Sequence, residues 1–176
     1  MAGIDETLTF KPVRAAVLTV SDSRTRDNDT SGDLLQSRIE DAGHYMGARE
    51  LLRDDISDIQ KQVKAWIADP EIDVVITTGG TGLTGRDVTV EALRPLFEKE
   101  IDGFSVIFHM KSYETVGLST LQSRACAGLA NSTIIFCLPG SNGAVKDGWD
   151  KVIRDQVDSR HKPCNLVELM PRFGER

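Results

Sequence analysis

Short apolar segments alternate with amphipathic helical patterns along this chain, and that alternation limits the possible folds more than any other feature. Apolar, β-rich runs occupy residues 14–21, 72–78 and 133–138, and residues 45–52 form a weaker fourth run. Strands that alternate with helices form a mostly parallel sheet covered by helices on both faces. The pattern therefore predicts an α/β fold, a three-layer α/β/α sandwich.

Helical patterns fill most of the chain between these strands. Ser31 is a candidate N-cap for a helix that Gly43 ends, and Ser57 begins a second helix with the spacing of a capping box. Residues 89–130 predict two or three further helices, and the apolar positions of residues 145–157 predict a final one.

Length and charge limit the class of protein. A chain of 176 residues has the size of one compact domain, and we predict a single domain with a core at about 14–165 and short tails. The formal net charge of −6 argues against a nucleic-acid-binding surface. The first ten residues lack a signal-peptide pattern, and no apolar run approaches the roughly 20 residues of a membrane span. We therefore expect a cytoplasmic protein that binds neither nucleic acid nor membrane.

The most distinctive motif follows the predicted strand at residues 72–78. Residues 77–87 read Thr-Thr-Gly-Gly-Thr-Gly-Leu-Thr-Gly-Arg-Asp. Glycines let backbone N–H groups approach an anion closely, and the threonine hydroxyls add donors, so the loop suits a phosphorylated ligand. A carboxylate about 4 Å from a phosphate would repel it by roughly 4 kcal/mol at an effective dielectric near 20. Because Mg²⁺ offsets such repulsion, Asp87 predicts a magnesium–nucleotide site.

Four loops follow the carboxyl ends of the predicted strands and therefore share one edge of the sheet. They cover residues 21–31, 53–55, 78–87 and 139–141. Ligands of open α/β sheets bind at this edge. The candidate site residues in these loops are Ser21, Asp29, Ser31, Asp54, Thr78, Gly79, Gly80, Thr81, Gly82, Arg86, Asp87, Pro139, Gly140 and Ser141.

The histidines and cysteines form no cluster in the sequence that would suggest a metal site or a histidine-based catalytic triad. The three histidines lie far apart in the sequence, and the three cysteines form no Cys-x-x-Cys pair. Without a clear nucleophile or general base, catalysis would depend on positioning and charge neutralisation, which favours nucleotidyl transfer. Gly80-x-Gly82-x-x-Gly85 also satisfies the dinucleotide fingerprint, but no acid ends a strand about 20 residues later. A dinucleotide-dependent oxidoreductase is therefore a distant alternative.

Several segments together resemble the MoaB/MogA family of molybdenum cofactor biosynthesis proteins. The resemblance runs from about residue 14 to residue 165, and its carriers are residues 19–22, 29–32, 77–87, 91–93, 103–104, 121–124 and 139–141. It implies a molybdopterin-binding α/β/α fold. For active members of the family, it also implies Mg-ATP-dependent adenylylation of molybdopterin with release of pyrophosphate.

The same resemblance implies roles for the candidate residues. Asp54 and Asp87 align with the two carboxylates associated with the reaction, so they would be the catalytic residues that hold Mg²⁺ and orient the ATP phosphates. The remaining candidates would bind nucleotide and pterin. Some MoaB proteins lack the activity, so a non-catalytic molybdopterin-binding protein is the second alternative. The family further implies a homo-oligomer, either a trimer or a hexamer, and a molybdate-insertion partner protein.

Overall fold

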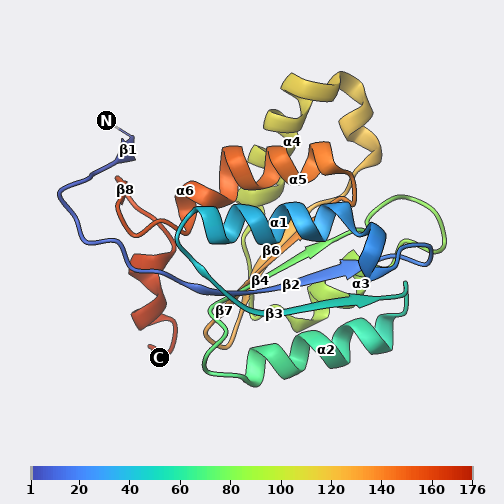
Figure 1. Ribbon diagram of the computed structural model, residues 1–176, viewed down its shortest axis with the longest axis horizontal. Helices are drawn as coiled ribbons and strands as arrows, with labels where there is room; N and C mark the ends of the chain where they lie inside the picture. Colours follow the sequence, from blue (N-terminus) through green and yellow to red (C-terminus); the bar gives the residue numbers. More distant parts are fainter. Residues whose placement is uncertain (1, 176) are drawn as a thin grey trace.

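The computed structural model of the protein describes residues 2–175, and its central element is a six-stranded sheet (Figure 1). The strand order is β3-β2-β4-β7-β6-β5. The first four of these strands are parallel, whereas β6 and β5 run antiparallel to their neighbours. The strands are β2 (Arg14–Val20), β3 (Tyr45–Leu52), β4 (Val74–Thr78), β5 (Lys99–Glu100), β6 (Cys126–Ala130) and β7 (Thr133–Leu138).

Helices cover both faces of the sheet, which confirms the predicted three-layer fold. One face packs against α1 (Thr30–Asp41), α4 (Asp102–Val116), α5 (Asn142–Gly148) and the π-helical stretch that joins α5 to the short helix α6 (Arg154–Gln156). The other face packs against α2 (Ile56–Ala68) and α3 (Thr89–Leu93). A π-helical stretch, Trp149–Ile153, joins α5 to α6. Short 3-10 helices occupy Arg26–Asn28, Arg94–Leu96, Gly117–Gln122 and Val167–Arg172.

The alternation of side chains along the strands produces a separate apolar core on each face. Val17 belongs to the core that contains Trp149, while its neighbour Leu18 belongs to the core that contains Trp66. Burying a large apolar side chain contributes about 1.5–3 kcal/mol relative to leaving it exposed. The two cores therefore fix the strands in register and hold the loops at their ends on a firm frame.

The first two long helices begin earlier than the sequence predicts. The N-cap of α1 is Asp29 rather than Ser31, and the N-cap of α2 is Asp55 rather than Ser57. Each aspartate accepts a hydrogen bond from the N–H group three residues later, which is the interaction that an N-cap provides. Both predicted caps are wrong by two residues, and the serines lie inside the first helical turn.

The prediction of two or three helices over residues 89–130 is confirmed by α3 and α4, but it misses two strands in that range, β5 and β6. Helices α3 and α4 occupy much of it, but β6 forms an antiparallel hairpin with β7 through a turn in which Asn131 has a φ of 54°. The β6 sequence, Cys-Ala-Gly-Leu-Ala, contains no β-branched or aromatic residue, so it lacks a strand signal. This strand forms because it pairs with β7 and because its side chains are buried in the cores on both faces of the sheet.

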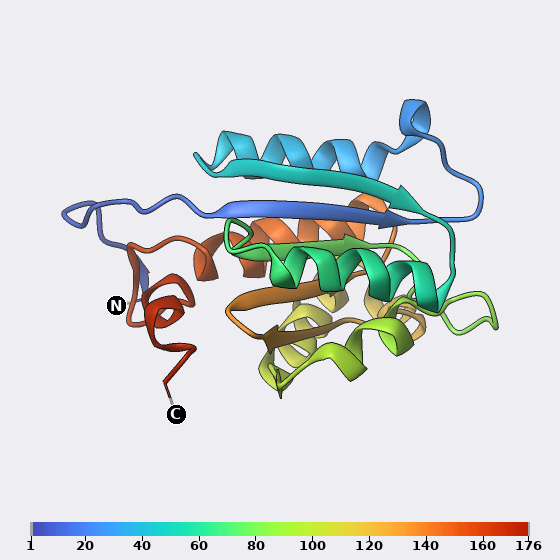
Figure 2. The ribbon, with the colours of Figure 1, turned by 90° about the horizontal axis from the view of Figure 1, so that it is seen from below.

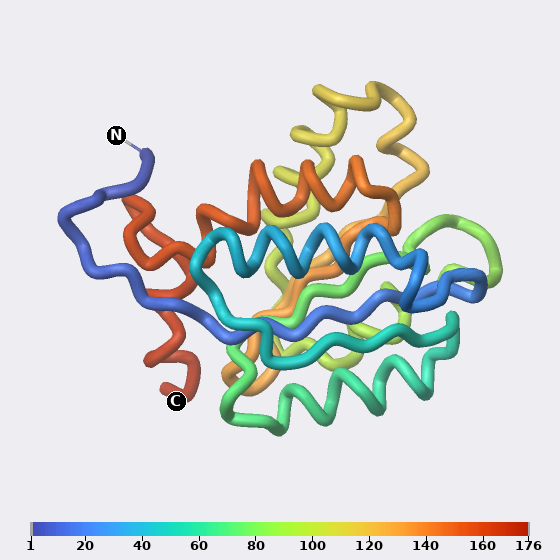
Figure 3. The backbone as a smooth tube through the Cα atoms, in the orientation of Figure 1, coloured from blue at the N-terminus to red at the C-terminus, as the bar shows by residue number. Residues whose placement is uncertain are grey.

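A second, two-stranded sheet near the ends of the chain lies away from the predicted ligand edge. Strand β1 (Gly3–Ile4) pairs antiparallel with β8 (His161–Lys162), and the tube in Figure 3 shows these segments side by side. Figures 1 and 2 both place the loops that follow β2 and β4 at the opposite end of the sheet. Among the described residues, no helix is long and apolar enough to cross a membrane.

Candidate functional site

A cavity of about 440 Å³ opens at the carboxyl edge of the sheet, among the loops that follow β2, β3, β4 and β7. This volume lies within the range of small-molecule binding sites. The predicted site residues that line the cavity are Ser21, Ser31, Asp54, Thr78, Gly79, Gly80, Thr81, Gly82, Arg86, Asp87, Pro139 and Gly140. The structure therefore brings together four loops that are distant in the sequence.

Two of the predicted site residues, Asp29 and Ser141, lie outside the cavity lining. Asp29 is fully buried behind the cavity at the N-terminus of α1. Ser141 caps α5, and its hydroxyl accepts a hydrogen bond from the backbone N–H of Ala144 at 3.1 Å. Both residues therefore stabilise helix N-termini next to the cavity and do not line it.

Glycines allow the loop after β4 to pack against the neighbouring strand ends. Gly79 and Gly80 have φ values of 98° and 61°, which L side chains rarely adopt. A Cβ atom on Gly79 would collide with the backbone carbonyl of Val20, and one on Gly140 would lie 3.0 Å from the Gly79 Cα. The N–H of Gly79 also donates to the Leu138 carbonyl at 3.1 Å. The loop backbone therefore forms the floor of the cavity.

The threonine hydroxyls contribute fewer free donors than the sequence suggests. The hydroxyl of Thr78 donates to the carbonyl of Pro139 at 3.0 Å, and that of Thr84 donates to Asp87 at 2.6 Å. Thr77 is fully buried and does not line the cavity. An anion in this loop would depend on backbone N–H groups and on Thr81, which lines the cavity.

Asp87 carries a fixed negative charge at the cavity. Its carboxylate accepts hydrogen bonds from the hydroxyl of Thr84 at 2.6 Å and from the backbone N–H of Thr84 at 2.9 Å. The Thr84 hydroxyl is the main cause that lowers the pKa of Asp87, and a bond from the Gly82 backbone adds to the effect. Asp87 is therefore ionised at neutral pH.

Asp54 has the opposite electrostatic character. Burial raises the pKa of its carboxyl group, and the negative charges of Asp22 and Asp87 raise it further. Its Oδ1 atom is buried and has no hydrogen-bond partner among the described residues, and the same holds for the hydroxyl of Thr89. A Cβ atom on Gly80 would run into both oxygens, so the two unpartnered atoms converge on one point of the loop. An unpartnered buried carboxylate oxygen is costly unless a ligand satisfies it.

These oxygens fit a magnesium ion that is shared with a phosphorylated ligand. Carboxylate oxygens are hard ligands, and Mg²⁺ usually takes only one or two of them together with phosphate oxygens and water. Within residues 2–175, no group of three or more His, Cys, Asp or Glu side chains forms a complete metal site. The arrangement of Asp54 and Asp87 thus fits a metal–phosphate complex better than an ion held by protein ligands alone.

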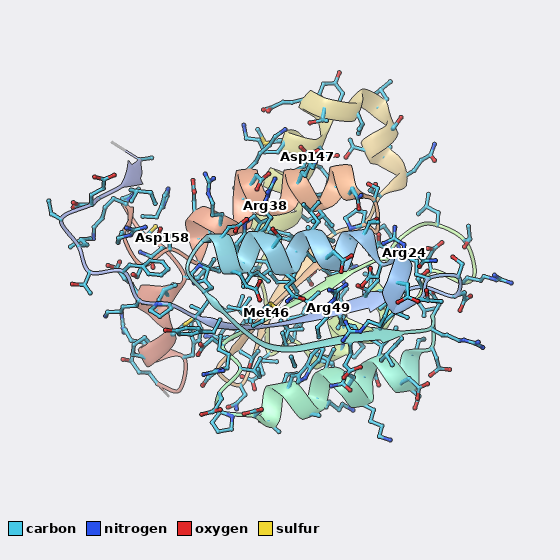
Figure 4. All side chains as sticks on the ribbon, viewed as in Figure 1. Arg24, Arg38, Met46, Arg49, Asp147 and Asp158 are labelled. Atoms are coloured by element: carbon cyan, nitrogen blue, oxygen red, sulfur yellow. The ribbon has the colours of Figure 1, made fainter. Side chains whose placement is uncertain are left out.

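A buried network around Asp29 supports the other side of the cavity. The Asp29 carboxylate accepts hydrogen bonds from the Thr19 hydroxyl at 2.8 Å, the Arg49 guanidinium at 2.9 Å and the Gly32 N–H at 3.0 Å. The Nη1 atom of Arg24 lies 3.4 Å from Oδ1 of the same carboxylate. Burial opposes ionisation of Asp29, but the bonds from Arg49, Thr19 and Gly32 outweigh it and lower its pKa. Figure 4 shows both arginines beside α1.

Arg124 fastens the glycine loop to the segment that follows α4. Its Nε donates to the carbonyl of Thr81 at 2.9 Å, and its Nη2 donates to the carbonyl of Asp87 at 3.1 Å. The guanidinium also pairs with both carboxylate oxygens of Glu91 at the start of α3. One side chain thereby holds both ends of the loop that carries Asp87.

The cavity also contains residues that the sequence does not mark as candidates. They are Thr19, Val20, Asp22, Ser23, Arg24, Thr84, Gln122 and Ser123. Asp22 and Arg24 lie in a loop already expected at this edge, and their charges are a signal that could have identified them. Gln122 ends a 3-10 helix and Ser123 follows it, so the rule that ligands bind at strand ends cannot find them.

Comparisons with known proteins agree with this architecture. Residues 16–159 match a family model described as "Probable molybdopterin binding domain". Molybdenum cofactor biosynthesis protein B of Escherichia coli (strain K12) is 47% identical over 157 residues, which cover 89% of this chain and 92% of that protein.

Solved structures give the same result. A crystal structure of a molybdenum cofactor biosynthesis protein B has a TM-score of 0.84 and 38% identity, covering 94% of this chain and 98% of the other. The tungsten cofactor synthesizing protein MoaB from Pyrococcus furiosus has a TM-score of 0.73 and 36% identity, covering 81% of this chain and 91% of the other. On the strength of sequence and fold together, this chain belongs to the MoaB/MogA family of molybdopterin-binding proteins.

Proposed function

We propose that this protein acts in molybdenum cofactor biosynthesis as a molybdopterin adenylyltransferase that uses Mg-ATP. One observation carries the proposal: the unpartnered carboxylate oxygen of Asp54 and the hydrogen-bonded carboxylate of Asp87 lie at one cavity with a glycine-rich loop. Membership of a molybdopterin-binding family supports the pterin as the second substrate.

In the proposed reaction, an oxygen of the terminal phosphate of molybdopterin attacks the α-phosphorus of ATP. A new P–O bond forms, and the bond between the α-phosphorus and the bridging oxygen breaks, so pyrophosphate leaves with the electron pair. The backbone N–H groups of Gly80 and Thr81 would bind phosphate oxygens, and the loop would hold the reactants in line. Asp54 and Asp87 would hold Mg²⁺, which when bound neutralises charge on the phosphates.

The second candidate is a molybdopterin-binding protein without catalytic activity. The observation that favours it is the state of Asp87, whose carboxylate is already bonded to Thr84 and Gly82 in its own loop. In that case Asp54, whose buried Oδ1 has no partner among the described residues, would be the main carboxylate contact of the ligand. In the catalytic case, the adenylylated product would pass to a molybdate-insertion protein.

The proposal includes a homo-oligomer, either a trimer or a hexamer. Helix α4 and the 3-10 helix after it expose a group of large apolar side chains, namely Val106, Ile107, Met110, Tyr113, Val116, Leu118 and Leu121. Apolar side chains gathered on one surface are typical of protein–protein contacts. Because Gln122 and Ser123 follow directly and line the cavity, self-association at this surface would also stabilise one wall of the site.

A product assay tests the proposed activity. The purified protein is incubated with Mg-ATP and molybdopterin, and mass spectrometry is used to detect adenylylated molybdopterin. We expect product with the wild type and a loss of at least about a hundredfold with Asp87→Asn, the scale of removing one preorganised electrostatic group. Asp102→Asn, at an exposed acid of α4, is the matched control and should retain activity. If the wild type gives no product above the Asp87→Asn background, the non-catalytic candidate replaces this one.

A further inference from the structure

We propose that Arg24 binds a phosphate monoester, the phosphate of the acceptor substrate, at the side of the cavity formed by the N-terminus of α1 and the loop after β7. This inference rests on the proposed function and deepens it, because it assigns a place to one of the two substrates. Arg24 lines the cavity, and its side chain remains 27% exposed.

The Arg24 guanidinium is held firmly by residues from two loops and a helix. It donates to the hydroxyl of Ser31 in α1, to the Asp29 carboxylate at 3.4 Å and to the backbone carbonyl of Gly140 at 3.1 Å. Ser31 and Gly140 are themselves cavity residues. A cation fixed in this way needs little further ordering when a ligand binds, and preorganisation of this kind favours affinity.

The partners of Arg24 leave part of its charge and hydrogen-bonding capacity for a ligand. Asp29, the one acidic partner of Arg24 among the described residues, makes a shorter ion pair with Arg49, at 2.9 Å, and also accepts a hydrogen bond from the Thr19 hydroxyl. Within residues 2–175, three of the five guanidinium N–H groups of Arg24 have acceptors, which leaves two. A planar guanidinium with free N–H groups matches the oxygens of a phosphate.

The distribution of charge in the cavity explains why such a residue is needed. Three carboxylates, Asp22, Asp54 and Asp87, and two guanidinium groups, Arg24 and Arg86, line it. The side chain of Arg86 is 82% exposed and lies 3.6 Å from Asp22, so solvent screens its charge. Arg24 is the less exposed of the two cations, and its interaction with an anion is correspondingly stronger.

The proposed reaction brings two phosphorylated substrates into this cavity. The carboxylates and the proposed magnesium ion account for the ATP phosphates. The phosphate of the acceptor carries its own charge into the same cavity and requires a cation of its own. Arg24, with Ser31 and the positive end of the α1 dipole beside it, provides that cation.

The test measures binding of inorganic phosphate, in the presence of a chelator, by ³¹P NMR, and binding of Mg-ATP by calorimetry. We expect Arg24→Gln to weaken phosphate binding at least about tenfold and to change Mg-ATP binding by less than about threefold, since the lost contact is a charge-assisted one. Arg24→Lys should give an intermediate phosphate affinity, because it keeps the charge without the planar fork. Arg53→Gln, an exposed arginine on the same edge, should change neither affinity.

Two results would overturn the assignment. If an Arg24→Gln protein that still melts cooperatively binds phosphate as the wild type does, Arg24 is not a phosphate ligand. If Arg24→Gln loses as much affinity for Mg-ATP as for phosphate, Arg24 binds the nucleotide instead of the acceptor phosphate. Should Arg24→Gln fail to fold, Arg24→Lys alone decides, because phosphate affinity equal to the wild type would contradict a guanidinium contact. Phosphate binding does not require turnover. If Arg24→Gln weakens phosphate binding but the wild type forms no adenylylated product, the enzymatic proposal is contradicted while the Arg24 phosphate site still holds.

Discussion

Asp29 illustrates how a single buried carboxylate supports several walls of a cavity. It is fully buried, and Arg49 beside it is only 13% exposed. Removing one partner of such a pair costs about 3–5 kcal/mol, so Asp29→Asn should lower the free energy of unfolding by about 3 kcal/mol in urea denaturation. Asp33→Asn removes a second partner of Arg49 that is 59% exposed and should cost less than about 1 kcal/mol. Equal losses in the two variants would contradict this account.

Asp54 is predicted to reduce stability when it ionises. Burial, followed by the charges of Asp22 and Asp87, raises its pKa in the folded protein above that of the unfolded chain. The folded state therefore binds this proton more tightly, and stability falls as the pH rises from the ordinary aspartate pKa through the folded one. Without magnesium, Asp54→Asn should be more stable than the wild type at neutral pH, and the difference should vanish below the ordinary pKa. Urea midpoints across this pH range check the prediction, which fails if the variant is the less stable protein at neutral pH.

At the scale of elements, the loop after β4 depends on glycine at particular positions. Gly80→Ala places a side chain at a φ of 61° and against the oxygens of Asp54 and Thr89. We expect a loss of about 1–3 kcal/mol in stability, the usual cost of a non-glycine residue in a strained conformation, and loss of the Mg-ATP-induced rise in melting temperature. Gly85→Ala is the control, because its Cβ meets no atom within 4 Å. A full Mg-ATP response in Gly80→Ala would show that this part of the loop does not form the site.

The elements that could be predicted from the sequence are those whose signals are local. The apolar runs of β2, β4 and β7 report burial on both faces of a parallel sheet, and glycine after β4 reports a close backbone approach. Strand β6 lacked such a signal because its burial depends on the elements packed around it. The helix caps were displaced by two residues because Asp29 and Asp55, rather than the serines, bond to the first free N–H groups.

In the candidate site, too, residues with a local signal could be predicted, whereas residues placed by tertiary contacts could not. The strand-end rule located the loops that carry Asp54 and Asp87, because parallel strands deliver their following loops to one edge. The rule could not find Gln122 and Ser123, which reach the cavity from a helix end. The contacts of Arg24 with Gly140, 116 positions away in the sequence, are tertiary and leave no trace in either segment alone.

At the scale of the whole molecule, the apolar surface of α4 predicts self-association. Met110, which is 63% exposed, lies on this surface, and Met110→Glu would place a charge where apolar side chains meet in an oligomer. We expect light scattering coupled to size-exclusion chromatography to give a trimer or hexamer for the wild type and a smaller species for this variant. Leu169→Glu, at another exposed apolar residue, should leave the mass unchanged. A monomeric wild type would contradict the prediction.

We propose that two loops at one sheet edge form a magnesium–nucleotide site around Asp54 and Asp87. The most direct test is calorimetric titration of ATP in the presence of magnesium and in the presence of a chelator. We expect ATP to bind at least about tenfold more tightly with magnesium, equivalent to about 1.4 kcal/mol, and we expect Asp54→Asn to lose this dependence. ATP binding of equal affinity with and without magnesium, or a full magnesium dependence in Asp54→Asn, would contradict it.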